Sequence, residues 1–88
     1  MSNLIDDSGG YHSYQIPKGL YGEASKIEEE FLEFKDAIQQ NNVLMAMLEL
    51  SDMIGAIEEY IKKYHMTLDD LLIMKNATKR AFECGRRK

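Results

Sequence analysis

The sequence predicts an all-α protein that contains three main helices. Three segments carry apolar residues at a helical spacing, and residues that favour turns separate them. No segment shows the apolar–polar alternation of a half-buried strand. The 88 residues are enough for one domain, but a core of this size is marginal on its own. Because small domains without disulfides are often stabilised by oligomerisation, we expect the helices to pack into an oligomeric bundle.

The chain is predicted to contain an irregular segment, a helical domain and a basic tail. Residues 1–22 include four glycines and an Ile16-Pro17 step, which interrupt regular structure. Several tyrosines in the same segment predict that part of it packs on the helical body. Residues 23–85 form the predicted helical domain, and residues 86–88 are all basic.

The first helix is predicted to run from about Glu23 to Gln40. Its apolar residues recur at i, i+4, i+7 and i+11 and form one stripe, which consists of Ile27, Phe31, Phe34 and Ile38. We expect this stripe to face the core. Asn41 and Asn42 then supply a turn, because asparagine tolerates left-handed and capping conformations.

A second helix is expected from about Val43 to Tyr64. Its first half is apolar around most of its circumference. A helix of this kind must be covered on nearly all sides, and the chain has few other elements that can cover it. We therefore expect part of the cover to come from another chain.

The third helix is expected to begin after Thr67, which has the side chain of an N-cap residue, and to end near Glu83. Asp69 and Asp70 lie in its first turn, where they complement the helix dipole. Gly85 follows as the expected C′ residue.

Charge is distributed unevenly along the chain, whose net charge is −4. Residues 1–70 carry fourteen acidic and five basic side chains, whereas residues 71–88 carry one acidic and six basic ones. The acidic body argues against a nucleic-acid-binding protein, whose binding face is normally basic. The basic end is either a favourable helix C-terminus with a solubilising tail, or part of a site where cations and an anionic ligand meet.

The sequence predicts a cytoplasmic protein that does not bind a membrane. No apolar run approaches the ~20 residues that a membrane span needs, and the first residues lack the basic and apolar pattern of a signal peptide. Cys84 is the one cysteine of the chain, which fits a reducing compartment.

Two pairs of carboxylates border the predicted core. On a helical wheel Glu30 and Glu33 fall on one flank of the first apolar stripe, about 60° and about 120° from its start. Glu49 and Asp52 have the same spacing and border the apolar arc of the second helix. Two antiparallel helices can present these pairs to one another, where four carboxylates repel unless cations neutralise them. The pairs predict either a site for Mg²⁺, with Mn²⁺ as a substitute, or the polar edge of a helical bundle.

The acidic pattern also resembles that of a known family. Glu29-Glu30-x-x-Glu33 is followed, after fifteen residues, by Glu49-x-x-Asp52. This spacing is similar to the E-E-x-x-E…E-x-x-D signature of the MazG-like, all-α nucleoside triphosphate pyrophosphatases. The resemblance implies a dimer or tetramer that uses Mg²⁺ to hydrolyse (d)NTPs between the α- and β-phosphates, which yields a monophosphate and pyrophosphate. It further implies that Glu29 positions or activates water and that the other four carboxylates bind the metal.

Further residues are candidates for contacts with a nucleotide. Lys75 falls near the centre of the inner stripe of the third helix, so its side chain either extends to solvent or reaches a buried anion. The phosphate-binding candidates on this helix are Lys75, Lys79 and Arg80. The base-binding candidates are Tyr11, His12 and Tyr14, whose alternative role is to cover apolar surface.

Two other functions stay open at the level of the sequence. Phosphoribosyl-ATP pyrophosphatase is an enzyme of the same superfamily and of similar length. A non-catalytic helical oligomerisation module belongs to a different class, in which the acidic residues serve only as surface. The pair Glu49 and Asp52 favours the enzyme, because a mere adaptor has no reason to keep two carboxylates inside an apolar helix.

Overall fold

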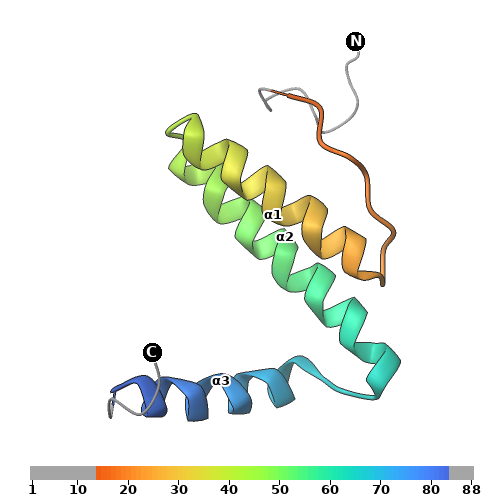
Figure 1. Cartoon of the computed structure of the whole chain (residues 1–88), viewed down its shortest axis with the longest axis vertical. Coiled ribbons are helices and arrows are strands. Elements are labelled where there is room, and N and C mark those ends of the chain that lie inside the picture. The colour runs from red at the N-terminus through yellow and green to blue at the C-terminus, as the bar shows by residue number, and fades with distance from the viewer. Residues whose placement is uncertain (1–13, 84–88) are drawn as a thin grey trace.

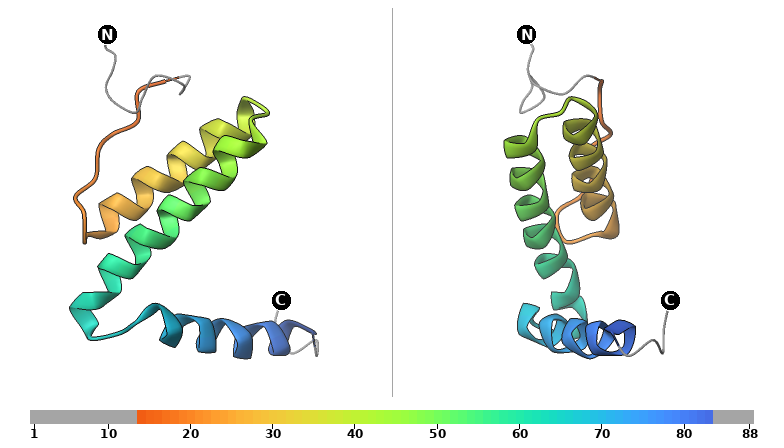
Figure 2. Two further views of the ribbon diagram at one scale, coloured as in Figure 1. Left: turned by 180° about the vertical axis from the view of Figure 1, so that it is seen from behind. Right: turned by 90° about the vertical axis from the view of Figure 1, so that its left-hand side faces the viewer.

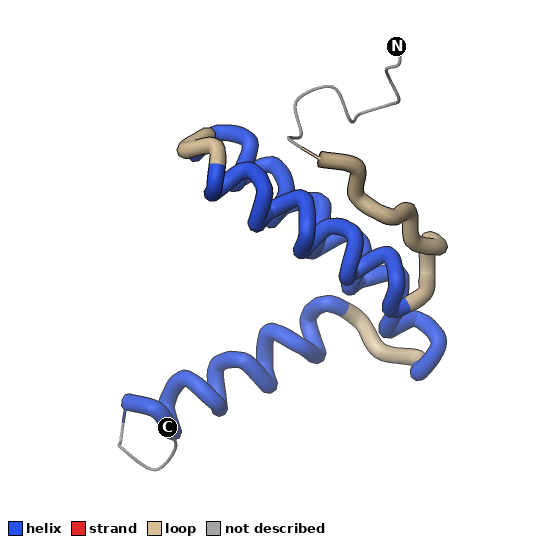
Figure 3. Tube along the Cα trace, turned by 45° about the horizontal axis from the view of Figure 1, so that its top comes forward, coloured by secondary structure: helices blue, strands red, loops and turns tan. Residues whose placement is uncertain are grey.

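The structure is a computed structural model, and it describes residues 14–83 apart from the side chains of residues 81 and 82. Within that range every regular element is helical and none is a strand (Figure 3). The predicted all-α class is therefore confirmed. The elements are α1 (Ala24–Gln39), α2 (Val43–Ile61), the 3₁₀ turn η2 (Lys62–Tyr64) and α3 (Leu68–Glu83).

Helices α1 and α2 lie side by side as an antiparallel hairpin (Figure 1). The connection is short because Asn41 adopts a left-handed conformation with a φ of 58°. Asn42 then caps α2, since its side-chain oxygen accepts a hydrogen bond of 3.1 Å from the backbone N–H of Met45. Both asparagines thus perform the turn and capping roles that the sequence predicts.

The chain changes direction after α2, which ends at Ile61 and not at Tyr64 as expected. The residues predicted to form the last turn of this α-helix form the 3₁₀ turn η2 instead. His65 follows in a left-handed conformation with a φ of 58°. Thr67 and Asp70 then form a reciprocal cap. The Thr67 N–H donates to Asp70 Oδ2 at 2.8 Å, and the Asp70 N–H donates to Thr67 Oγ1 at 3.3 Å.

Helix α3 extends away from the hairpin and makes little contact with it (Figures 1 and 2). Within residues 14–83 the apolar residues of α3 therefore make little contact with the other helices. Leu72, Ile73 and Met74 are exposed. The described residues therefore form a helical hairpin from which a third helix projects, and they do not close into a three-helix bundle.

The buried face of α1 is not the one that the sequence predicts. Phe31 and Ile38 of the apolar stripe are about half exposed, with exposed fractions of 46% and 50%. The face turned toward α2 instead carries acidic residues and Ala37. The expectation that the apolar stripe faces the core is therefore wrong for the single chain. Small residues line the contact from both sides, because Ala46 and Ala56 are the buried apolar residues in the middle of α2.

Part of the segment before α1 packs on the hairpin, as expected, although its described tyrosines, Tyr14 and Tyr21, are exposed. It doubles back along α1 (Figure 1), and Ile16 is buried. The Leu20 N–H donates to Ser25 Oγ at 3.0 Å, which ties the segment to the first turn of α1. Gly19 passes so close to that turn that a Cβ placed on it would lie 2.2 Å from the Ser25 carbonyl oxygen. A side chain at this position requires the backbone to move.

Much apolar surface stays exposed on the described part of the chain. Exposed large apolar residues lie on all three helices, and those on α2 are Val43, Leu44, Met47, Leu48 and Ile54. Their density on α2 agrees with a helix that needs a further cover. In residues 14–83 no helix has the length and hydropathy that crossing a membrane requires.

Two glycine-to-alanine substitutions should act in opposite directions. Gly19→Ala should loosen the segment before α1, because its Cβ overlaps the Ser25 backbone. Gly55→Ala in α2 should raise the free energy of unfolding by about 0.5–1 kcal/mol, because its Cβ meets nothing within 4 Å and alanine favours the helix. Urea denaturation and amide hydrogen exchange of residues 16–20 measure the two effects. Equal stability changes of one sign would contradict the packing described here.

Candidate metal centre

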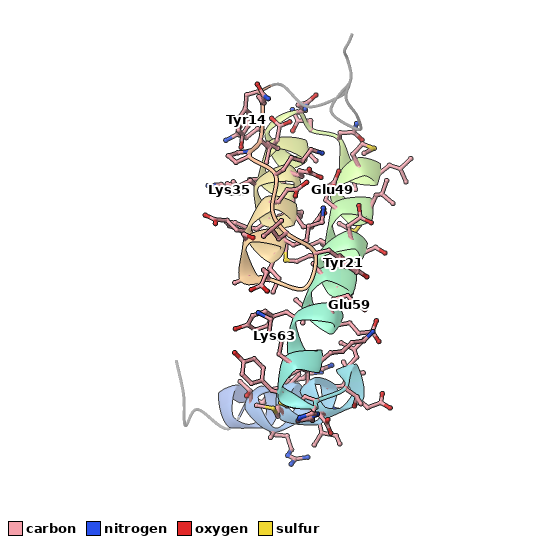
Figure 4. All side chains as sticks on the ribbon, turned by 90° about the vertical axis from the view of Figure 1, so that its right-hand side faces the viewer. Tyr14, Tyr21, Lys35, Glu49, Glu59 and Lys63 are labelled. Carbon is pink, nitrogen blue, oxygen red and sulfur yellow. The ribbon has the colours of Figure 1, made fainter. Side chains whose placement is uncertain are left out.

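A cluster of carboxylates fills the space between α1 and α2. Its members on α1 are one or three residues apart, so they share one face of the helix. Glu49 enters from α2 and is 1% exposed (Figure 4). The buried acidic residues of the described chain are Glu29, Glu30, Glu33, Asp36 and Glu49. Carboxylates are rarely buried without a partner, so a cluster of five buried acidic residues is the candidate functional site of the described chain.

The carboxylates form two overlapping groups. Oxygen atoms of Glu29, Glu30 and Glu33 lie within 4.8 Å of one another. Oxygen atoms of Glu30, Glu49 and Asp52 do the same, although Asp52 is exposed. Glu30 belongs to both groups. The structure therefore places all five acidic residues of the quoted motif in one cluster, with Glu30 at its centre.

Glu29 is held by groups from three directions. Its Oε1 atom accepts hydrogen bonds from the Gly19 N–H at 2.8 Å and from Lys26 Nζ at 3.2 Å. Its Oε2 atom lies 4.0 Å from the exposed ammonium of Lys18. Burial raises the pKa of Glu29, but the Gly19 amide, the Lys26 ammonium and a hydrogen bond with Glu33 outweigh it and leave the pKa below its ordinary value. Glu29 is thus an ionised carboxylate at neutral pH.

The pKa of Glu33 is shifted in the opposite direction from that of Glu29. Burial, a hydrogen bond with Glu49 and the negative charge of Glu30 raise its pKa from 4.5 to about 9. A further hydrogen bond with Glu29 acts in the same direction. Glu33 therefore holds a proton at neutral pH and uses it to bridge neighbouring carboxylates. The proton relieves part of the repulsion within the cluster.

Glu30 shows that the internal hydrogen bonds do not satisfy the cluster. Its side chain is 8% exposed, and its Oε2 atom lies 3.3 Å from Lys26 Nζ. The Oε1 atom is buried and has no hydrogen-bond partner within the described residues. An unsatisfied carboxylate oxygen in such a place is costly, and a bound cation removes that cost. The donor set contains only oxygen atoms, which suits Mg²⁺ or Mn²⁺.

A pocket of about 280 Å³ opens beside the cluster. Glu30 and Asp52 line one part of it, and Lys26 and Tyr21 another. The remaining lining residues are small: Ser51, Gly55 and Ala56. Glu30 and Asp52 are therefore the carboxylates that a ligand in this pocket can reach.

Sequence reasoning missed two members of the cluster. Asp36 is 0% exposed, and the side-chain amide of Gln40 donates to its Oδ2 atom at 2.9 Å. Lys26 is the cation of the cluster. Both lie on the helix face that carries the motif. Asp36 is three residues after Glu33, and Lys26 is three residues before Glu29 and four before Glu30. That spacing could have identified them.

The predicted substrate-binding residues lie elsewhere or outside the described range. Lys75, Lys79 and Arg80 are exposed on α3, and none of them lines the pocket. Tyr14 is exposed on the segment before α1. Tyr11 and His12, like Cys84, Gly85 and the basic tail, fall outside the residues that the structure describes. Their predicted roles stay predictions.

Comparison of the chain with models of known protein families, with curated proteins and with solved structures finds no match. The resemblance to the MazG-like family therefore depends on the spacing of the acidic motif. The structure adds that the five residues of this motif lie together.

The stability of the metal-free protein should fall as the pH rises from about 4.5 to about 9. Over this window the folded chain holds a proton on Glu33 that the unfolded chain has released, so each increase in pH favours unfolding. Urea denaturation in the presence of a chelator measures the slope. Glu33→Gln should flatten it, whereas Glu58→Gln, at an exposed position on α2, should not. A wild-type stability that increases toward pH 8 would contradict the protonated state of Glu33.

Proposed function

We propose that this protein is a homo-oligomeric, Mg²⁺-dependent nucleoside triphosphate pyrophosphohydrolase. The observation that carries the proposal is the buried carboxylate cluster, whose Glu30 Oε1 atom has no partner among the described residues and whose edge lines a pocket. The spacing of the motif, which resembles that of the MazG-like enzymes, supports the reaction type. Hydrolysis between the α- and β-phosphates would give a nucleoside monophosphate and pyrophosphate.

In this proposal Glu30, Glu33, Glu49 and Asp52 hold the metal. Bound Mg²⁺ supplies positive charge that neutralises the triphosphate and favours attack of water on the α-phosphorus. Glu33 must release its proton to become a ligand, because only the carboxylate form donates both oxygens to a cation. The exposed position of Asp52 suits a residue that bridges the cluster and the pocket.

Glu29 is suited to orienting water. Its pKa lies below the ordinary value, which makes its carboxylate a weak base. Its Oε1 atom accepts a hydrogen bond of 2.8 Å from the Gly19 N–H, and this backbone contact fixes the carboxylate in place. A fixed acceptor lowers the entropic cost of placing a nucleophile, which is the main contribution that a protein makes to this reaction.

The exposed apolar surface supports a homo-oligomer, either a dimer or a tetramer. The buried apolar residues of the described chain are mostly alanine, which makes a small core, and further copies can cover the exposed residues of α2. The phosphate-binding roles of Lys75, Lys79 and Arg80 require α3 to approach a cluster. In the proposed oligomer that cluster is either its own or that of another subunit.

A panel of NTPs, dNTPs and phosphoribosyl-ATP, incubated with Mg²⁺, should identify at least one substrate that yields pyrophosphate and a monophosphate. Asp52→Asn should abolish this turnover while helicity and oligomeric state persist, because Asp52 is exposed and contributes little to the core. Asp69→Asn, at an exposed position on α3, is the matched control and should leave turnover unchanged. Failure of wild type on every nucleotide tested would end the enzymatic proposal in favour of a non-catalytic module.

Leu44→Lys should reduce the molecular mass in solution. Leu44 is 80% exposed on α2, so a lysine there costs the single chain little but places a charge in the proposed interface. Light scattering during size-exclusion chromatography measures the mass. Wild type should elute as a dimer or tetramer, and Glu58→Lys serves as a charge-reversed control on the same helix. A monomeric wild type would contradict the homo-oligomer.

A further inference from the structure

Lys26 is a cation in direct contact with the carboxylate cluster. Its ammonium lies 3.2 Å from Glu29 Oε1 and 3.3 Å from Glu30 Oε2, and its side chain is 26% exposed. It is the lysine that lines the pocket beside Glu30 and Asp52. Lys18, the other lysine near Glu29, lies at 4.0 Å and is mostly exposed. Lys26 therefore supplies the principal positive charge that the described chain brings to the cluster.

The contact with Glu30 places Lys26 next to the position that a divalent cation needs. Glu30 is the carboxylate shared by both groups of the cluster, and its Oε1 atom is buried without a partner in the described range. A divalent cation on Glu30 would lie close to the ammonium on Oε2 of the same carboxylate. Two cations at such a separation repel strongly in a partly buried site. The metal and the Lys26 ammonium therefore compete for Glu30.

The side chain of Lys26 has room to move when a divalent cation displaces its ammonium from Glu30. A lysine carries its charge on a flexible four-carbon stem, so the ammonium can turn without a change in the backbone. The pocket of about 280 Å³ lies on the same side of the cluster. Asp52 lines the same pocket, so an ammonium that turns into it is positioned to meet an anion that enters there.

We propose that Lys26 is a displaceable counter-cation: it neutralises Glu29 and Glu30 before the metal binds, leaves Glu30 when a divalent cation arrives, and then binds a phosphate oxygen of the nucleotide. The proposal rests on the proposed function, because it assumes a divalent cation at Glu30. It assigns Lys26 two successive partners of the same charge, a carboxylate and a phosphate.

A static role for Lys26 predicts the opposite effect on metal binding. If Lys26 served only to hold Glu29 and Glu30 in position, its removal would misplace these ligands and weaken the affinity for metal. If it competes with the metal, its removal strengthens that affinity. The sign of the change separates the two roles without any measurement of turnover.

The test is isothermal titration calorimetry of Mg²⁺ into the protein without nucleotide. Lys26→Met keeps the length of the side chain and removes its charge, and it should lower the Kd for Mg²⁺ by about five-fold or more through loss of a nearby like charge. Lys26→Arg should stay close to wild type. Lys35→Met removes an exposed lysine from α1 and should change nothing. With Mg²⁺ and a non-hydrolysable NTP analogue present, Lys26→Met should bind the nucleotide more weakly than wild type.

The outcomes separate this inference from the proposed function. An unchanged or higher Kd for Mg²⁺ in Lys26→Met overturns the displaceable counter-cation, while metal binding by wild type leaves the proposed function intact. If wild type itself binds no Mg²⁺, both proposals fail. Circular dichroism confirms that each variant is folded before titration. If Lys26→Met does not fold without metal, Lys26→Gln takes its place, and the same sign of change is required.

Discussion

The structure depends on the burial of several carboxylates between two helices. Glu30 and Glu33 from α1 meet Glu49 from α2 in the space that would otherwise hold a hydrophobic core. Like charges in a poorly solvated space repel, so the hairpin can close only if positive charge or protons enter with them. A proton on Glu33 and the ammonium of Lys26 meet this requirement in the protein as described.

The same cluster explains why the rest of the chain is arranged as it is. Its oxygen atoms occupy the inner face of α1, so Phe31 and Ile38 lie toward the outside. Alanines on both helices keep the backbones close enough for carboxylates to meet. The segment before α1 then contributes a backbone N–H at Gly19, a position where only glycine fits. Stability and the proposed chemistry thus compete for one small interior, which is common where a site occupies the core.

The sequence predicted those features that depend on neighbours within about four residues. The starts of the helices, the turn at Asn41 and the N-cap at Thr67 all arise from such local hydrogen bonds, and the structure agrees with them, whereas α2 ends three residues before the predicted Tyr64. The composition of the acidic cluster was also largely predictable, because the period of a helix places Glu30 and Glu33 on one face. The same period extends to Lys26 and Asp36, which were overlooked.

Only the tertiary structure decided which face of α1 turns inward and where α3 lies. A helix can rotate about its own axis without any change in its local hydrogen bonds, so periodicity shows that Phe31 and Glu30 lie on different faces but does not choose between them. The choice is made by distant partners: Glu49 on α2, and the Gly19 amide ten residues before Glu29. The direction of α3 depends on the left-handed conformation at His65, and no residue pattern in the sequence predicts that conformation. The sequence alone determined the helices and their chemistry, and long-range packing determined which of their surfaces meet.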